Sequence, residues 1–153
     1  PAATTAAAIV DGALAQVDRR GRAVEIDVPD GLPAVVTDAS LAQRVLANVV
    51  TNACRFSPLE QPVRVRVGAV GGDLEILVID RGPGMSREKR DVVLAAFEHL
   101  SGAQLTVGLN LTVASGLARL LGGRLMFEDT PGGGLTVGVE LPLEPPAPVP
   151  ATT

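Results

Sequence analysis

The chain has 153 residues, of which 46% are apolar and 20% charged, so it can bury a core and is not disordered by composition. It has three Phe and neither Trp nor Tyr, its net charge is −4, and its basic residues are scattered, which argues against a nucleic-acid partner. The single cysteine, Cys54, excludes an internal disulfide and a cysteine-based metal cluster.

The first third of the chain predicts a helix, a strand and a second, long helix. Residues 5–18 are rich in Ala and other apolar residues, and residues 24–28 alternate between apolar and acidic side chains, as in a half-buried strand. Capping side chains at 38–40 begin a helix that reaches about Arg55, with an apolar stripe at about 100° per residue. The N-terminus lacks a basic leader and a Met, so we expect a fragment cut from a longer protein.

The rest of the chain predicts mostly hairpins. Residues 62–70 and 73–81 are strand-like and separated by two glycines. Helices are expected at 86–97 and 109–121, with an irregular segment at 101–107 and a last strand pair at 124–129 and 134–141. This pattern predicts a two-layer α+β sandwich over residues 1–143, followed by a Pro-rich, disordered tail at 144–153.

Three polar side chains share one face of the long helix. Asn48, Asn52 and Arg55 follow at spacings of four and three, opposite the apolar stripe. Two amide oxygens beside a cation suit a hydrated Mg²⁺ and a phosphate. A solvated helix face is the alternative interpretation.

Two glycine-containing segments supply other parts of a nucleotide site. Asp80 ends a strand, and Gly82 and Gly84 after it allow the backbone to approach a ligand closely. A carboxylate here would accept the exocyclic amine of adenine, whereas a tight turn is the alternative explanation. Residues 108–111 lie at the start of the helix expected at 109–121, and the N-terminus of a helix attracts phosphate.

Four segments together resemble a known family. NVVTNACRFSP (48–58), DRGPG (80–84), FEHL (97–100) and VGLNLTVASGLARLLGG (107–123) are similar to the asparagine, first glycine, Phe and second glycine boxes of sensor histidine kinases. The resemblance is to their ATP-binding catalytic domain, in the superfamily with gyrase, Hsp90 and MutL, and it covers residues 5–143. The segment EDTPGGGLTVGVELP resembles the potassium-responsive Kdp-type kinases. The resemblance implies a Bergerat-type fold, with a mixed, mostly antiparallel sheet covered by helices on one face.

The resemblance also implies roles for residues of the long helix. Asn52 and Asn48 would coordinate Mg²⁺, Arg55 would lie near the phosphates, and Phe56 would pack by the adenine. Relatives that hydrolyse ATP have a catalytic Glu at the position of Asn48. An amide cannot act as that general base, so phosphoryl transfer to a protein is favoured, with Asn48 and Arg55 as the catalytic residues.

In the two glycine boxes, the resemblance implies that Asp80 binds the adenine amine and that Gly82 and Gly84 shape the pocket floor. The residues implied to face the phosphates are Gly108, Leu109, Asn110 and Leu111.

The second glycine box departs from the family pattern, because Thr106 and Asn110 replace two of its glycines. The Phe box ends on Leu100, and no Lys or Arg lies between Phe97 and Gly108. We therefore expect weak ATP binding, with a Kd of roughly 0.1–1 mM.

The implied function is the ATP-binding domain of a two-component kinase. It would bind Mg-ATP and donate the γ-phosphoryl group to a histidine on a dimerisation domain absent from this chain, so the chain alone is inactive. His99, the only histidine, is expected to lie in the lid region, the segment between Phe97 and Gly108, and not to be the acceptor. A response regulator would be the next partner. The whole protein is expected to be a homodimeric, membrane-bound bacterial sensor with this domain in the cytoplasm.

Two other functions stay open. The altered second glycine box fits a docking or regulatory module whose nucleotide site has degenerated. A serine kinase acting on an anti-sigma antagonist has the same superfamily fold.

Overall fold

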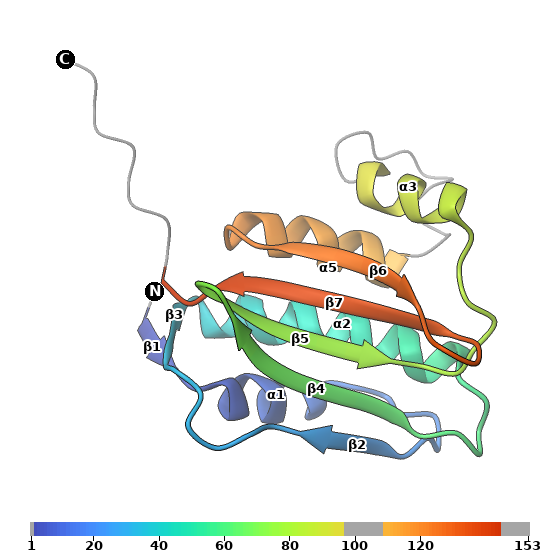
Figure 1. Ribbon diagram of the computed structural model, residues 1–153, viewed down its shortest axis with the longest axis horizontal. Coiled ribbons are helices and arrows are strands. Elements are labelled where there is room, and N and C mark those ends of the chain that lie inside the picture. The colour runs from blue at the N-terminus through green and yellow to red at the C-terminus, as the bar shows by residue number, and fades with distance from the viewer. Residues whose placement is uncertain (1, 97–108, 145–153) are drawn as a thin grey trace.

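The computed structural model describes residues 2–96 and 109–144 and consists of a five-stranded sheet with helices on one face (Figure 1). β2 lies parallel to its neighbour β4, and the other neighbouring pairs are antiparallel. This arrangement confirms the predicted two-layer α+β sandwich. In spatial order the strands are β2 (Val24–Asp27), β4 (Val63–Val70), β5 (Asp73–Ile79), β7 (Leu135–Pro142) and β6 (Arg124–Asp129).

Three helices form the second layer: α1 (Ala6–Leu14), α2 (Ala39–Phe56) and α5 (Leu109–Leu120). α2 packs between α1 and α5 and contacts the central strands β5 and β7. A further helix, α3 (Arg87–Ala96), packs beside α5 and lies to one side of the sheet (Figure 1). In the described part of the chain, no helix is both long and apolar enough to cross a bilayer.

The ends and the stripe of α2 follow from its sequence. The Asp38 carboxylate caps the helix by accepting a hydrogen bond from the Leu41 N–H at 3.1 Å. The helix ends at Phe56, two residues before Pro58, which cannot continue it. Cys54 is fully buried, as expected of a small core residue. The predicted stripe is also buried: Ala42, Leu46, Val49, Val50 and Ala53.

Two features differ from the sequence-based expectation. β1 (Ala2–Thr4) and β3 (Val35–Thr37) pair as a separate two-stranded antiparallel sheet that was not predicted. Three-residue strands are too short to show an alternating pattern. α1 ends at Leu14 rather than at residue 18, because the residues after Leu14 no longer present a continuous buried face.

Candidate functional site

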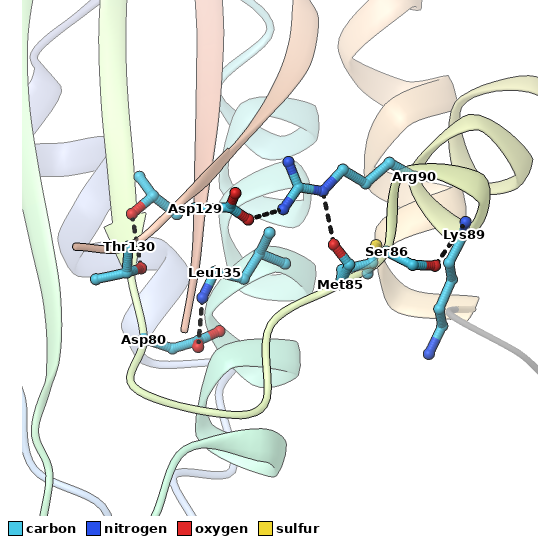
Figure 2. A network of polar contacts seen from close by, with 9 residues as sticks. Asp80, Met85, Ser86, Lys89, Arg90, Asp129, Thr130 and Leu135 are labelled. Carbon is cyan, nitrogen blue, oxygen red and sulfur yellow. Dashed lines mark hydrogen bonds and ion pairs between the residues drawn. The ribbon is translucent and has the colours of Figure 1, made fainter. Parts of the chain in front are cut away.

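Asp80 lies immediately after β5 and is only 3% exposed. Its Oδ1 accepts hydrogen bonds from the Gly82 N–H at 2.9 Å and from the Leu135 N–H at 3.0 Å. The Asp80 N–H in turn donates to the Leu135 carbonyl at 3.0 Å, so strand β7 holds this residue through both its backbone and its side chain. Figure 2 shows the bond from the Leu135 N–H to the carboxylate. Both side-chain bonds end on Oδ1, which leaves Oδ2 to accept a donor from a ligand.

The electrostatics of Asp80 follow from its position. Burial raises the pKa of its carboxyl group by desolvation, and the backbone hydrogen bonds from Leu135 and Gly82 offset part of this rise. No ion pair in residues 2–96 and 109–144 includes this carboxylate. The site thus has a buried acceptor whose charge is stabilised by two N–H groups rather than by a cation.

The loop after Asp80 packs on the C-terminal end of α2. A Cβ on Gly82 would lie 2.7 Å from the Phe56 carbonyl oxygen, so a larger residue would push the loop away from the helix. Gly84 has a φ of +77°, in the region that favours glycine. The Arg81 N–H donates to the buried Ser57 Oγ at 3.2 Å. Glycine is therefore required at both predicted positions by the backbone: at Gly82 by the close approach to α2, and at Gly84 by the positive φ.

A pocket of about 50 Å³ opens beside the Asp80 carboxylate. Its walls come from three separate parts of the chain: α2, the segment from Asp80 to the first turn of α3, and the start of β7. The structure therefore brings together four predicted residues: Asn52, Phe56, Asp80 and Gly84. The lining residues that complete the pocket are Pro83, Met85, Lys89 and Leu135.

The polar face predicted on α2 is divided in the structure. Asn52 is 5% exposed and lines the pocket, so it is not on a solvated face opposite the core. No hydrogen bond within the described residues uses its amide, which leaves its oxygen available to a ligand. Asn48 is half-buried, does not line this pocket, and donates from Nδ2 to the Arg44 carbonyl at 2.9 Å. Its Oδ1 is therefore the atom that remains as an acceptor.

Arg55 and Phe56 lie together at the exposed end of α2. The Arg55 guanidinium carbon is 5.4 Å from the centroid of the Phe56 ring, a cation–π contact. Phe56 is 45% exposed although it also lines the pocket, so part of its ring is available to a ligand.

The second glycine box is only partly described. Gly108 and the Phe box, with His99, lie outside the described residues, and of Leu109 only the backbone at the start of α5 is described. Asn110 is half-buried and Leu111 fully buried. The phosphate-facing role of this segment stays a prediction.

Sequence reasoning missed Gly134, Leu135 and Lys89. A Cβ on Gly134 would lie 2.1 Å from the Asp80 carbonyl oxygen, so glycine here lets β7 approach Asp80. Three consecutive glycines, 132–134, are more than an ordinary hairpin turn needs. They were the one feature of the sequence that could have indicated a close backbone contact at Gly134.

Comparison with known proteins gives the family. The model described as "Histidine kinase-, DNA gyrase B-, and HSP90-like ATPase" matches residues 37–145. The chain belongs to this family. The family resemblance noted from the sequence is thereby confirmed.

Several relatives of this family member are sensor kinases. Sensor protein KdpD of Mycobacterium tuberculosis is 42% identical over 120 residues, which cover 77% of this chain and 14% of KdpD. Sensor protein kinase CarS of Pseudomonas aeruginosa is 40% identical over 100 residues, 65% of this chain and 22% of CarS. The chain thus spans about a seventh of its KdpD relatives and is a histidine-kinase-type ATPase domain.

Solved structures agree with this assignment. The mycobacterial sensor histidine kinase MprB superposes with a TM-score of 0.74 at 27% identity, covering 94% of this chain and 97% of that one. Full-length ShkA, solved in complex with AMPPNP, superposes with a TM-score of 0.70 at 26% identity, covering 89% of this chain and 29% of that one.

Proposed function

We propose that this domain binds Mg-ATP in the pocket beside Asp80 and donates the γ-phosphoryl group to a histidine on a separate dimerisation domain. The observation that carries the proposal is the buried Asp80 carboxylate, held by two backbone N–H groups with Oδ2 left for a ligand. A fixed acceptor of this kind pairs with the exocyclic amine of adenine and repels the carbonyl of a 6-oxopurine. The family of nucleotide-binding ATPases supports the same ligand.

The residues of α2 fit a magnesium ion bound with the phosphates. The Asn52 amide makes no hydrogen bond within the described residues, and the Asn48 Oδ1 atom remains available as a metal ligand. Neutral oxygen ligands that leave most positions to water and phosphate suit Mg²⁺. The described residues contain no cluster of three His, Cys, Asp or Glu, so these amides are the donors we assign. When bound, the ion would neutralise phosphate charge, and Arg55 would add a cation nearby.

The same residues favour transfer over hydrolysis. Asp80 is the only carboxylate among the lining residues, all of which lie in the described chain, and its Oδ1 is occupied by backbone donors. The amide of Asn48 cannot take a proton from water. The domain would then act by positioning the nucleotide for an acceptor supplied by another domain.

The rest of the proposed protein lies outside this chain. We propose that it comprises a dimerisation domain with the acceptor histidine, in a homodimeric membrane-bound protein with this domain in the cytoplasm, and that a response regulator is its partner. The longer relative named as a sensor protein, of which this chain covers 14%, supports a larger sensor kinase. The division into a domain at 1–143 and a disordered tail at 144–153 belongs to the same proposal.

The test is a titration of Mg-ATP and Mg-ITP by calorimetry, using wild type, Asp80→Asn and Asn52→Ala. In Asp80→Asn, the side-chain oxygen can keep both backbone hydrogen bonds while an NH₂ group meets the adenine amine. We expect a loss of ATP affinity of at least about tenfold, the scale of a hydrogen bond to a charged group, and a smaller preference for ATP over ITP.

Asn52→Ala serves as the comparison. It should weaken binding of both nucleotides in the presence of Mg²⁺ and should leave the ATP/ITP ratio unchanged. An Asp80→Asn variant with unchanged nucleotide preference would contradict the assigned base contact. A folded wild type that binds no nucleotide at several millimolar would favour the docking-module alternative.

A further inference from the structure

Lys89 occupies a place that its sequence context did not suggest. It lies in the run Arg87-Glu88-Lys89-Arg90, which reads as solvated charge on a helix. In the structure it lines the same pocket as Asp80 and Asn52, and among the lining residues, all within the described chain, it is the only basic one.

The first turn of α3 holds Lys89 beside the pocket. Its backbone N–H donates to the Ser86 Oγ at 3.2 Å, which caps the helix start. The neighbouring Arg90 donates from Nε to the Met85 carbonyl at 3.0 Å and pairs with the Asp129 carboxylate (Figure 2). Because Met85 also lines the pocket, these contacts fix the helix relative to the pocket wall.

The ammonium group of Lys89 is not committed elsewhere in the described structure. No ion pair in residues 2–96 and 109–144 uses it, whereas Arg90 is paired with Asp129. Figure 2 shows the Lys89 side chain directed away from the Arg90–Asp129 pair. The cation is therefore available to a ligand.

The positions of the two charged residues indicate which part of a ligand each would meet. Asp80 is 3% exposed, so its carboxylate marks the closed end of the pocket, whereas Lys89 is exposed and marks the open end. A nucleotide whose base pairs with Asp80 must leave its ribose and phosphates toward the open end. The segment 97–108, which includes the Phe box, contains no Lys or Arg that could take this role.

We infer that Lys89 is a nucleotide-binding residue of this chain, whose ammonium group attracts the phosphate-bearing part of the ligand at the mouth of the pocket. This inference rests on the proposed function. Because Lys89 is exposed, water and salt screen the interaction, and its contribution should be a factor of about five rather than orders of magnitude.

The experiment is an NMR-monitored titration of ATP, ADP and adenosine into wild type, Lys89→Met, Lys89→Arg and Arg87→Met. Arg87 is a matched control, because it is exposed on the same helical turn, carries the same charge and does not line the pocket. We expect Lys89→Met to weaken ATP about fivefold at low salt and adenosine hardly at all. Lys89→Arg should stay near wild type, and added salt should reduce the difference.

Two results of this titration would overturn the role assigned to Lys89, and a third would overturn that role while leaving the proposed function intact. Equal losses of ATP affinity in Lys89→Met and Arg87→Met would overturn the inference, since only the general field of the helix would then matter. An equal loss for adenosine would overturn it too, by showing that Lys89 only packs against the base. If wild type binds ATP and Asp80→Asn does not, while Lys89→Met matches wild type, the proposed function stands and this inference alone fails.

Discussion

Gly134 gives the sharpest test of how the site is built. The turn between β6 and β7 is closed by hydrogen bonds from the Thr130 N–H to the Gly134 carbonyl, 3.1 Å, and from the Gly133 N–H to the Thr130 carbonyl, 2.9 Å. Gly133 and Gly134 have similar φ values, +115° and +118°. They differ in surroundings, because a Cβ on Gly134 would lie 2.1 Å from the Asp80 carbonyl oxygen and one on Gly133 would have no heavy atom within 4 Å.

A comparison of Gly133→Ala with Gly134→Ala separates the cost of backbone strain from the cost of steric overlap. An alanine at either position adopts an unfavourable φ, at a cost of about 1–3 kcal/mol. Only Gly134→Ala adds an overlap with backbone atoms, and overpacking of this kind costs a further 1–3 kcal/mol or more. We therefore expect about 1–3 kcal/mol of destabilisation for Gly133→Ala and about 2–6 kcal/mol for Gly134→Ala. The larger value is a substantial part of the roughly 5–15 kcal/mol typical of domains.

The overlap should also weaken nucleotide binding. Relief of the clash must move β7 away from Asp80, and Leu135, the next residue, donates the hydrogen bond that fixes Oδ1. Urea unfolding followed by far-UV circular dichroism suits a chain without Trp or Tyr, and ATP titration in the absence of urea measures the site. Equal losses of stability in the two variants would refute the steric argument. Unequal stability with equal ATP affinity would refute its connection to Asp80.

Two further predictions concern charge. Burial raises the pKa of the Asp80 carboxyl group, so the folded chain binds this proton more readily than the unfolded chain does. The carboxyl group therefore lowers the free energy of unfolding as the pH rises from its ordinary pKa of 3.8 through its raised pKa in the folded chain. Urea unfolding measured from pH 3.8 to neutrality should therefore show that Asp80→Asn gains stability relative to wild type as the pH rises. If the free energies of unfolding of the two proteins changed in parallel with pH, this prediction would be contradicted. Arg90→Met should remove roughly 1 kcal/mol, because the Asp129 partner is exposed and the Met85 carbonyl loses a donor, and should speed hydrogen exchange in α3. Unchanged exchange would show that Arg90 does not anchor this helix.

The sequence predicted those features that depend on local periodicity or on a single turn. The five sheet strands and the helices at 39–56, 87–96 and 109–120 were expected within a few residues, because each shows an alternating or helical apolar pattern. The β1–β3 pair was missed, because two three-residue strands far apart in the chain carry no such pattern.

The candidate site was predicted where its residues stand next to one another in the chain. Asp80, Gly82 and Gly84 were identified from one pentapeptide, and Asn52 from its helical spacing. The role of Leu135 was not predictable, because it depends on strand register across 55 residues. Lys89 has the sequence context of surface charge, since nothing in its neighbours reveals that the first turn of α3 is held against Met85.

The charge of Asp80 is the strongest physical argument that this pocket binds a donor. Its two hydrogen bonds are both accepted by Oδ1, and an asparagine oxygen would satisfy the same two N–H groups without a buried charge. The carboxylate also lacks an ion-pair partner in the described residues, so its desolvation is not offset by a cation. The fold therefore has no need of a negative charge at this position. The charge becomes useful once a ligand donates a hydrogen bond to Oδ2, which is the interaction that an adenine amine would make.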